Sequence, residues 1–475
     1  MDNSLLMTFN ELSDSLGAEL FPGEGGEKGF FSVGIDSRNL KEGSLFVALV
    51  GTIQDGHAYA EAAFKAGAAG IMAARSRLEQ FNLKALSEKW GRFLVIVEDT
   101  LKGLQDAARV YLEKFPHLLK IAITGSSGKT TSKEIIAAMV AQEKNVVMNS
   151  GNLNSETGLP LSVFNVCAEH EVGIFEAGMN RKGEISELAE VLKPNIALIT
   201  NIGSAHIGMI GSKETIAKEK KDIFSKFTGN EKALIPADDM FRDFLCQGVK
   251  GKTIFYGAKE LFKLREVRDL GLLGTEINWA GKIAHYSLPG SFNLKNAFSA
   301  IAIAREIPLC DESIIKGLES VKPLFGRGEI FEGRVTVVRD CYNSNPESME
   351  AAIEFCDSLD WQGDRQGRKI YVIGSMFELG EKSIQAHEDL GRILALSHAD
   401  MIFLFGVETE IAAAVLALGK VSYFHTNKMD DLIAAIDSYI IPGDLVLLKG
   451  SRGCALEQLT PVLTKDKITA QGESK

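Results

Sequence analysis

The sequence lacks closely spaced cysteines. The 475 residues contain no CxxC pair and no cluster of cysteine and histidine at zinc-binding spacing. The six cysteines lie far apart, at Cys167, Cys246, Cys310, Cys341, Cys356 and Cys454. This scatter argues against a structural zinc site and a disulfide framework, and it favours a reducing cytoplasm.

Long hydrophobic runs are also missing. No stretch of 18 apolar residues occurs, and the first segment, MDNSLLMTFNELSDSLG, lacks the basic start and apolar centre of a secretion signal. We therefore expect neither a membrane span nor secretion, and we expect a cytoplasmic monomer.

The chain has no excess of positive charge. Its formal net charge of -11 argues against nucleic acid or an anionic membrane as a partner. Anionic substrates would therefore need local cationic sites.

The order of apolar strands and helical patterns predicts an α/β protein of three domains. A length of 475 residues suits about three domains at roughly 150 residues each. Residues 1–115 read as a compact α/β domain, 116–326 as a central domain with a mainly parallel sheet, and 327–475 as a second, Rossmann-like unit. The boundaries are placed where a helical pattern ends before Pro116 and near the segment PLFGRGE.

The segment IAITGSSGKTTSKEIIAAMV has the context of a phosphate-binding loop, because an apolar strand runs through a Gly/Ser turn into an amphipathic helix. Gly125 and Gly128 let backbone N–H groups approach phosphate, Lys129 supplies a charge, and the Thr130 hydroxyl can bind Mg²⁺. Ile123 stands where the long P-loop pattern has glycine, so this is the shorter GxxGK[ST] form. An ordinary strand-to-helix turn is the alternative, but the flanking elements favour ATP binding.

Two further residues follow predicted strands. Glu176 ends the run VGIFE, and His206 lies shortly after IALITNIG. Open parallel sheets place ligands at such strand ends, so a Mg²⁺ ligand is one interpretation of each. A helix cap or a surface charge is the other.

Lys220 lies in the helical segment SKETIAKEKKDIFSKF, at a position that belongs to its apolar stripe. The other members of the stripe are Ile216, Ile223, Phe224 and Phe227. The lysine either extends its amine to the surface or is buried with a lowered pKa. A buried neutral amine would permit carbamylation by CO₂, which would create an oxygen ligand for Mg²⁺.

Several segments together resemble the Mur ligase family, the ATP-dependent amide-forming enzymes of peptidoglycan precursor synthesis. They occur in the family's order along nearly the whole chain: TGSSGKTT, GNLNSETGLP, EAGM, NIGSAHIGMIGS, PGSFNLKNAFSA, GRGE and DCYNSNPES. The resemblance implies a P-loop domain between an N-terminal uridine-binding domain and a C-terminal Rossmann-like domain.

Within the family, the chain is most similar to the branch that adds D-alanyl-D-alanine to UDP-N-acetylmuramoyl-tripeptide. DCYNSNPES, GSMFELGEKSIQAHEDLG and LVLLKGSRGCALE resemble that branch, and a DNPR-like motif for a free diamino acid is missing. The expected product is the UDP-N-acetylmuramoyl-pentapeptide, formed through an acyl phosphate. The alternatives are the family member that adds the third amino acid and a non-catalytic regulator that binds ATP and a UDP-sugar.

The resemblance also implies roles for individual residues. Those with a catalytic role would be Lys129, Lys220, His206 and Arg327. ATP would contact Thr124, Gly125, Ser126, Ser127, Gly128, Lys129, Thr130, Thr131, Asn293, Asn296, Arg327, Asp340, Asn343 and Asn345. Two Mg²⁺ ions would be held by Thr130, Glu176, His206 and carbamylated Lys220. The UDP-sugar peptide would contact Asp36, Ser37, Arg38, Asn152 and Asn154. Caps, turns and surface charges remain the alternative for the asparagine and serine positions.

The sequence departs from the family pattern at two positions. Ser375 stands where aspartate is usual, and Phe292 precedes Asn293 where histidine is common. Neither change removes an expected phosphate or metal ligand. They bear on the dipeptide and adenine contacts and leave the reaction class unchanged.

Overall fold

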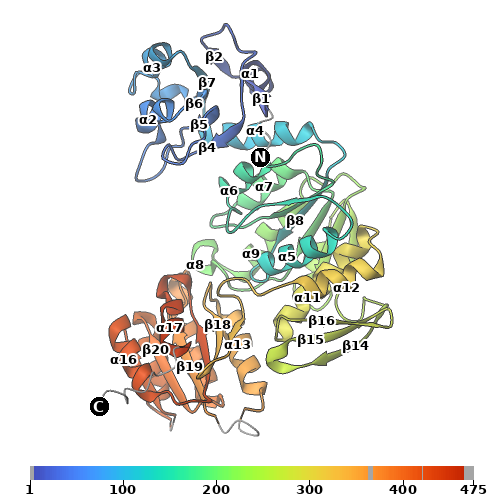
Figure 1. The fold of residues 1–475 in the computed structure, drawn as a ribbon, viewed down its shortest axis with the longest axis vertical. Coiled ribbons are helices and arrows are strands. Elements are labelled where there is room, and N and C mark those ends of the chain that lie inside the picture. The colour runs from blue at the N-terminus through green and yellow to red at the C-terminus, as the bar shows by residue number, and fades with distance from the viewer. Residues whose placement is uncertain (1–4, 362–366, 420, 465–475) are drawn as a thin grey trace, which may run out of the picture.

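The computed structural model describes residues 5–361, 367–419 and 421–464, and these contain three large sheets with helices packed on them (Figure 1). The three sheets follow one another along the long axis of the molecule in chain order, as the colour change from blue to red in Figure 1 shows. The predicted α/β class, with a mainly parallel central sheet between two further α/β units, is confirmed.

The N-terminal sheet has the strand order β2-β7-β6-β5-β4, with only β2 antiparallel to its neighbour. Its strands are β2 (Glu19–Phe21), β4 (Ser32–Gly34), β5 (Ser44–Val47), β6 (Gly70–Ala74) and β7 (Phe93–Val97). Of the three inner strands, β5 and β6 are buried along their whole length and β7 is buried except at Val97, as expected for parallel strands covered on both faces. The accompanying elements are α1 (Phe9–Leu16), α2 (Ala60–Lys65), α3 (Leu83–Trp90) and the pair β1 (Met7–Thr8) and β3 (Gly29–Phe30).

Helix α4 (Thr100–Glu113) joins this unit to the next. Asp99 caps its first turn by accepting hydrogen bonds from the N–H groups of Leu101 and Lys102. Near its other end, the Tyr111 hydroxyl donates to the Val166 carbonyl at 2.7 Å. The helix therefore packs on the central unit as well as on the N-terminal sheet.

The central sheet is parallel throughout, with the order β13-β12-β11-β8-β10-β9. Its strands are β8 (Leu119–Thr124), β9 (Val146–Met148), β10 (Val172–Glu176), β11 (Ile196–Ile199), β12 (Lys232–Pro236) and β13 (Lys252–Tyr256). Its principal helices are α5 (Lys129–Val140), α6 (Gly158–Val163), α7 (Glu184–Leu192), α8 (Ile207–Ile210), α9 (Lys213–Lys221) and α10 (Arg242–Cys246). Because all strands point the same way, the residues that follow β8, β10 and β11 meet at one edge of the sheet.

A small antiparallel sheet was not predicted from the sequence. It consists of β14 (Leu264–Asp269), β15 (Thr275–Trp279) and β16 (Lys282–Tyr286), beside α11 (Ser291–Glu306) and α12 (Asp311–Ser320). One face is buried through Trp279 and Tyr286, while the other is exposed. Polar residues alternate with apolar ones in these strands. They were not predicted because the strands expected from the sequence were continuous apolar runs.

The C-terminal sheet has the order β17-β18-β22-β19-β20-β21, and only β17 runs antiparallel. Its strands are β17 (Glu329–Phe331), β18 (Thr336–Asp340), β19 (Lys369–Gly374), β20 (Met401–Phe405), β21 (Tyr423–Thr426) and β22 (Leu445–Lys449). Its helices are α13 (Pro346–Ser358), α14 (Ser383–Leu396), α15 (Glu410–Leu416), α16 (Met429–Tyr439) and α17 (Thr460–Thr464). Strands and helices alternate here as in Rossmann-like sheets.

Two further observations concern the cysteines and the helices. All six cysteines have free thiols. Within the described ranges, no helix combines the length and the apolar character that crossing a bilayer requires.

Candidate active site

The turn between β8 and α5 has the geometry of a phosphate loop. At Gly128, φ is +77° and an added Cβ would lie 2.2 Å from Asn296 Oδ1. At Gly125, an added Cβ would lie 1.8 Å from Thr200 Oγ1. Glycine is therefore required at both positions, because neither the backbone conformation of the first nor the surroundings of either accept a side chain.

The residues after β11 hold this loop in place. Asn201 accepts hydrogen bonds from the N–H of Ser126 through its carbonyl and from the N–H of Ser127 through Oδ1, each at 3.1 Å. The Thr200 hydroxyl donates to the Ser127 carbonyl at 2.6 Å. The loop is thus preformed, and the first turn of α5 directs its free backbone N–H groups toward it. The predicted phosphate-binding residues run without a gap from the end of β8 into this turn: Thr124, Gly125, Ser126, Ser127, Gly128, Lys129, Thr130 and Thr131.

Two lysine amines converge on one carbonyl oxygen of the loop. Lys129 Nζ and Lys220 Nζ each donate to the Gly125 carbonyl, both at 2.9 Å. The two lysines come from α5 and α9, 91 residues apart in sequence (220 minus 129). Burial is the main cause that lowers the pKa of Lys129, and Arg327 adds to it while Glu176 opposes it.

Lys220 is buried, and this decides between the two alternatives for its position in the apolar stripe. It is 1% exposed, and the apolar members of the stripe are buried with it. Burial, followed by the charge of Lys129, lowers its pKa well below the ordinary value. A lowered pKa favours the neutral amine, which is the form that reacts with CO₂.

Glu176, the last residue of β10, points its carboxylate at the first turn of α5. Its Oε2 accepts a hydrogen bond from the Thr130 hydroxyl at 2.7 Å, and its Oε1 accepts one from Asn154 Nδ2 at 2.6 Å. The side chain is 2% exposed. The structure thus brings together Thr130, Glu176 and Asn154, three residues that the sequence had assigned to metal and substrate.

His206 lies at the boundary with the C-terminal unit. It precedes α8 with φ +60°, and its Nδ1 is 2.7 Å from Glu378 Oε2, which follows β19. Nearby, Glu347 accepts hydrogen bonds from the N–H and hydroxyl of Ser204 and pairs with Lys213 at 2.8 Å. Two carboxylates of the C-terminal unit therefore contact the segment that carries His206, and the sequence search had found neither.

Asn293 and Asn296 are buried in the first turns of α11. Asn293 Nδ2 donates to the Pro289 carbonyl at 2.8 Å, and Asn296 Oδ1 accepts from Ser132 at 3.4 Å. Asn296 is also the side chain nearest to Gly128. Arg327 follows in the segment between the two sheets, with its guanidinium 4.2 Å from the ring centroid of Tyr342.

The C-terminal residues assigned to ATP are organised by a buried lysine. Lys449, at the end of β22, pairs with Asp340 at 2.8 Å and donates to the Asn343 carbonyl at 2.9 Å. Asn345 caps α13 by accepting from the N–H of Ser348, which is the capping alternative left open by the sequence. The Ser375 hydroxyl is buried and has no hydrogen-bond partner among the described residues.

The predicted uridine-diphosphate residues form an exposed turn after β4. Arg38 binds Asp36 through Nε at 2.9 Å and through Nη2 at 2.7 Å, and its side chain is 85% exposed. Hydrogen bonding by Arg38 lowers the pKa of Asp36 to about 2. Ser37 lies between them, and the turn belongs to the N-terminal unit, separate from the phosphate loop. Asn152 lies instead in the central unit, where its carbonyl accepts from the N–H of Asn154 at 2.8 Å.

Comparison with known proteins places this arrangement in a family. The sequence matches "Mur ligase family, catalytic domain" over residues 31–111, "Mur ligase middle domain" over 123–304 and "Mur ligase, glutamate ligase domain" over 326–452. A relative from Treponema pallidum (strain Nichols), named UDP-N-acetylmuramoyl-tripeptide--D-alanyl-D-alanine ligase, is 40% identical over 98% of this chain and 100% of its own length. The chain belongs to the Mur ligase family.

Solved structures agree with the assignment of this Mur ligase to its family. MurF from Acinetobacter baumannii superimposes with a TM-score of 0.85 at 26% identity, covering 97% of this chain and 99% of that one. MurF ligase from Thermotoga maritima in complex with ADP gives a TM-score of 0.76 at 28% identity, covering 91% and 97%. The likeness therefore extends over all three sheets.

Several residues at the site of this Mur ligase were missed by the sequence search. Lys133 and Lys449 are buried lysines, and Asn149 and Asn201 are asparagines that organise loops. Lys133 had a detectable signal, because it lies on the buried face of α5 in the same way as Lys220 does on α9. The asparagines had none, since their role depends on backbone groups far away in sequence.

Proposed function

We propose that this enzyme joins D-alanyl-D-alanine to UDP-N-acetylmuramoyl-tripeptide at the expense of ATP. The observation that carries the proposal is the end-to-end match to the Treponema pallidum relative, whose name states this reaction. We place the three domains at 1–115, 116–326 and 327–475, since these divisions separate the three large sheets. We further propose that the enzyme acts as a cytoplasmic monomer.

In the proposed reaction, a carboxylate oxygen of the tripeptide attacks the γ-phosphorus of ATP, and ADP leaves. The amine of D-alanyl-D-alanine then attacks the acyl carbon, phosphate leaves, and the amine proton passes to solvent or a base. Both first reactants are anions, so the protein must offset their repulsion. Lys129 and Arg327 supply positive charge, and the N–H groups at the start of α5 supply the hydrogen bonds for the phosphates.

The donor atoms at the end of β10 suit Mg²⁺. The Thr130 hydroxyl and the Glu176 carboxylate are hard oxygen ligands, and Mg²⁺ is usually held by one or two carboxylates together with substrate phosphates and water. No group of three His, Cys, Asp or Glu residues suited to a metal occurs in the ranges described, as expected if ATP supplies the remaining oxygens. When bound, Mg²⁺ would neutralise phosphate charge.

Carbamylation of Lys220 is a separate proposal for a second metal position, shared with His206. Its support is the buried amine with a strongly lowered pKa beside the phosphate loop. A carbamate would replace an amine whose charged form is disfavoured by burial with an anion that Lys129 can pair with. The pair of Nζ atoms on the Gly125 carbonyl places the amine next to Lys129 for this purpose.

The remaining assignments concern the ends of the two nucleotides. We assign Asp36, Ser37 and Arg38 to the UDP group, because Asp36 holds an exposed guanidinium whose fork geometry suits a pyrophosphate. We assign Asn293 and Asn296 to the adenine side of the phosphate loop, and Asp340, Asn343 and Asn345 to nucleotide contacts from the C-terminal domain. We assign Asn152 and Asn154 to the peptide side, since Asn154 donates to Glu176 and Asn152 bonds the backbone of Asn154.

The test is ATP-dependent phosphate release with purified enzyme and UDP-N-acetylmuramoyl-tripeptide carrying either lysine or diaminopimelate. D-Alanyl-D-alanine should support release, and free diamino acids should not. Release with a free diamino acid on the dipeptide substrate, and none with D-alanyl-D-alanine, would instead identify the enzyme that adds the third residue. Binding of ADP without any ligation would identify a regulator.

A further inference from the structure

A lysine on the phosphate-loop helix has no part in the reaction described above. Lys133 lies one turn after Lys129 on α5 and is 0% exposed. Its Nζ donates to the Asn149 carbonyl at 2.6 Å and lies 3.4 Å from Glu134 Oε1. Burial of a charged amine is costly unless the group is paired and hydrogen-bonded, and these two contacts supply both conditions.

Asn149 links Lys133 to Glu176. The side chain is fully buried, and its Oδ1 accepts from the N–H of Glu176 at 2.9 Å. Its Nδ2 donates to the carbonyls of Glu176 at 3.0 Å and Leu153 at 2.8 Å. Asn149 therefore pairs with both backbone groups of Glu176 and also fixes the chain four residues further on.

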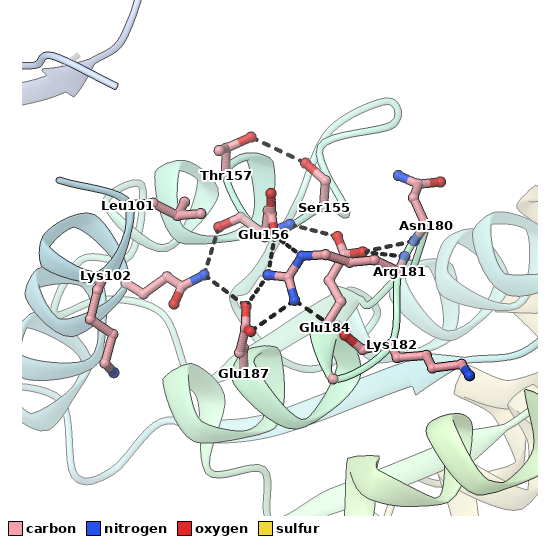
Figure 2. A network of polar contacts seen from close by, with 12 residues as sticks. Leu101, Lys102, Ser155, Glu156, Thr157, Asn180, Arg181, Lys182, Glu184 and Glu187 are labelled. Carbon is pink, nitrogen blue, oxygen red and sulfur yellow. Dashed lines mark hydrogen bonds and ion pairs between the residues drawn. The ribbon is translucent and has the colours of Figure 1, made fainter. Parts of the chain in front are cut away.

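A second buried charge holds the other end of the same segment. Glu184, the first residue of α7, is 2% exposed, and its Oε1 accepts from the N–H of Glu156 at 3.0 Å. Its Oε2 accepts from the N–H of Asn180 at 2.7 Å, so one carboxylate joins two loops (Figure 2). Outside it, Arg181 pairs with both Glu156 and Glu187, as the dashed lines in Figure 2 show.

The segment 149–157 thus lies between two buried charges, and its middle touches the carboxylate of Glu176. The N–H of Gly178 donates to the Asn154 carbonyl at 2.8 Å, and Asn154 Nδ2 donates to Glu176 Oε1 at 2.6 Å. One carboxylate oxygen is therefore held by this segment, and the other is held by Thr130. The orientation of the carboxylate depends on where the segment lies.

We propose that Lys133 and Glu184 are positioning residues for the metal-nucleotide site. Together they fix the segment 149–157, which in turn keeps Asn154 on Glu176 so that the free lone pairs of the carboxylate face the phosphate loop. Neither residue touches a reactant. The proposal rests on the proposed function, in which Glu176 serves Mg²⁺ and ATP. Groups that orient a metal ligand commonly change metal affinity by about 10- to 100-fold when they are removed.

The test compares ADP binding with and without Mg²⁺ by calorimetry on the full chain. The variants are Lys133→Met, which keeps the length of the stem, and Glu184→Gln, which keeps the shape but removes an acceptor. Both should raise the Kd for ADP with Mg²⁺ about 10- to 100-fold, while the Kd for ADP in EDTA changes by no more than about two-fold. A role limited to folding would lower thermal stability without this selective loss.

Matched controls come from the same region. Lys144→Met removes a lysine that follows α5 and pairs with Glu171, and Glu187→Gln removes an outer partner of Arg181. Both controls should bind ADP as the wild type does, with and without Mg²⁺.

The outcomes separate the inference from the proposed function. If the wild type binds ADP no more tightly with Mg²⁺ than without it, the proposed function fails. If the wild type shows the Mg²⁺ effect and both folded variants keep it, or lose both affinities equally, the positioning roles are refuted. If Lys133→Met does not fold, Glu184→Gln decides alone, because it acts on the other end of the segment.

Discussion

The phosphate-loop site and the Asp36–Arg38 turn use the same kinds of side chain in opposite surroundings. Each has a carboxylate and a basic side chain: Glu176 ends β10 and Lys220 lies on α9, whereas Asp36 and Arg38 follow β4. In the first, Glu176 is 2% exposed and Lys220 is 1% exposed, whereas the Arg38 side chain is 85% exposed. The difference is therefore in solvation and not in chemical type.

Solvation decides how much of each site is fixed before substrates arrive. Charges in a low-dielectric interior interact strongly and must be satisfied by hydrogen bonds, so the buried site holds its groups in one geometry. An exposed ion pair is screened and contributes little to stability. We expect substitutions at the buried site to reduce turnover or Mg²⁺-dependent nucleotide binding strongly, and substitutions at the exposed turn to weaken only the binding of the UDP-linked substrate.

The largest effect is expected for Lys220→Ala. Loss of this group should reduce turnover by about 10²- to 10³-fold, the range seen when one electrostatic group of an active site is removed. Steady-state phosphate release measures the change. If the lysine acts as a carbamate, short carboxylic acids should restore part of the activity, because they can occupy the space left by the side chain.

The matched control is Lys218→Ala on the same helix, where the side chain is exposed. It should retain normal turnover and show no response to carboxylic acids. Full activity of Lys220→Ala without rescue would refute an essential role and remove the main contrast with the exposed turn.

Glu176→Gln should have the next largest effect. The amide keeps the shape but loses the negative charge, so nucleotide binding that depends on Mg²⁺ should weaken by about 100-fold, the upper end of the range for groups that only orient a metal ligand. Titration of the enzyme with Mg²⁺ at fixed ADP measures this. An unchanged Mg²⁺ midpoint would show that the carboxylate serves only to bind Thr130 and Asn154.

The same contrast explains how much could be predicted from the sequence. The phosphate loop and Lys220 were predictable, because Gly128 needs a positive φ and a lysine interrupts an apolar stripe, and both requirements are local. Glu347 and Glu378 were not, since their partners Ser204 and His206 lie more than 140 residues away and no local pattern marks such contacts. The antiparallel strands β14 to β16 were missed because only one of their faces is buried.

Arg38→Ala tests the exposed side of the comparison. Loss of one charge-assisted hydrogen bond should raise the KM for the UDP-linked substrate about 10-fold and leave kcat nearly unchanged. Thermal stability should not change measurably, because the ion pair is exposed. Arg75→Ala is the control, since Arg75 is a surface arginine of the same domain that pairs with Glu19 and Glu98. A large fall in kcat for Arg38→Ala would contradict the division between binding and catalysis.

The smallest effect is expected for protonation of His57, a buried side chain in the same domain as the exposed Asp36–Arg38 turn. The side chain is 1% exposed, its Nδ1 is 2.6 Å from Asp55 Oδ1, and its Nε2 accepts from the N–H of Ala74 at 2.9 Å. Burial lowers the pKa of His57, aided by Arg77 and opposed by Asp55. Because the folded pKa lies below the unfolded one, stability is full above about pH 6.5 and falls as the pH drops through that value, by at most about 1.4 kcal/mol per pH unit.

Hydrogen exchange of the peptide that contains Ala74 measures this directly. Protonation of Nε2 removes the acceptor for the Ala74 N–H, so protection corrected for intrinsic exchange should fall only as the pH drops below about 6.5. His57→Gln should give lower protection without that pH step. A flat profile in the wild type would mean that the imidazole keeps one protonation state throughout, and the predicted loss of stability at low pH would then be wrong.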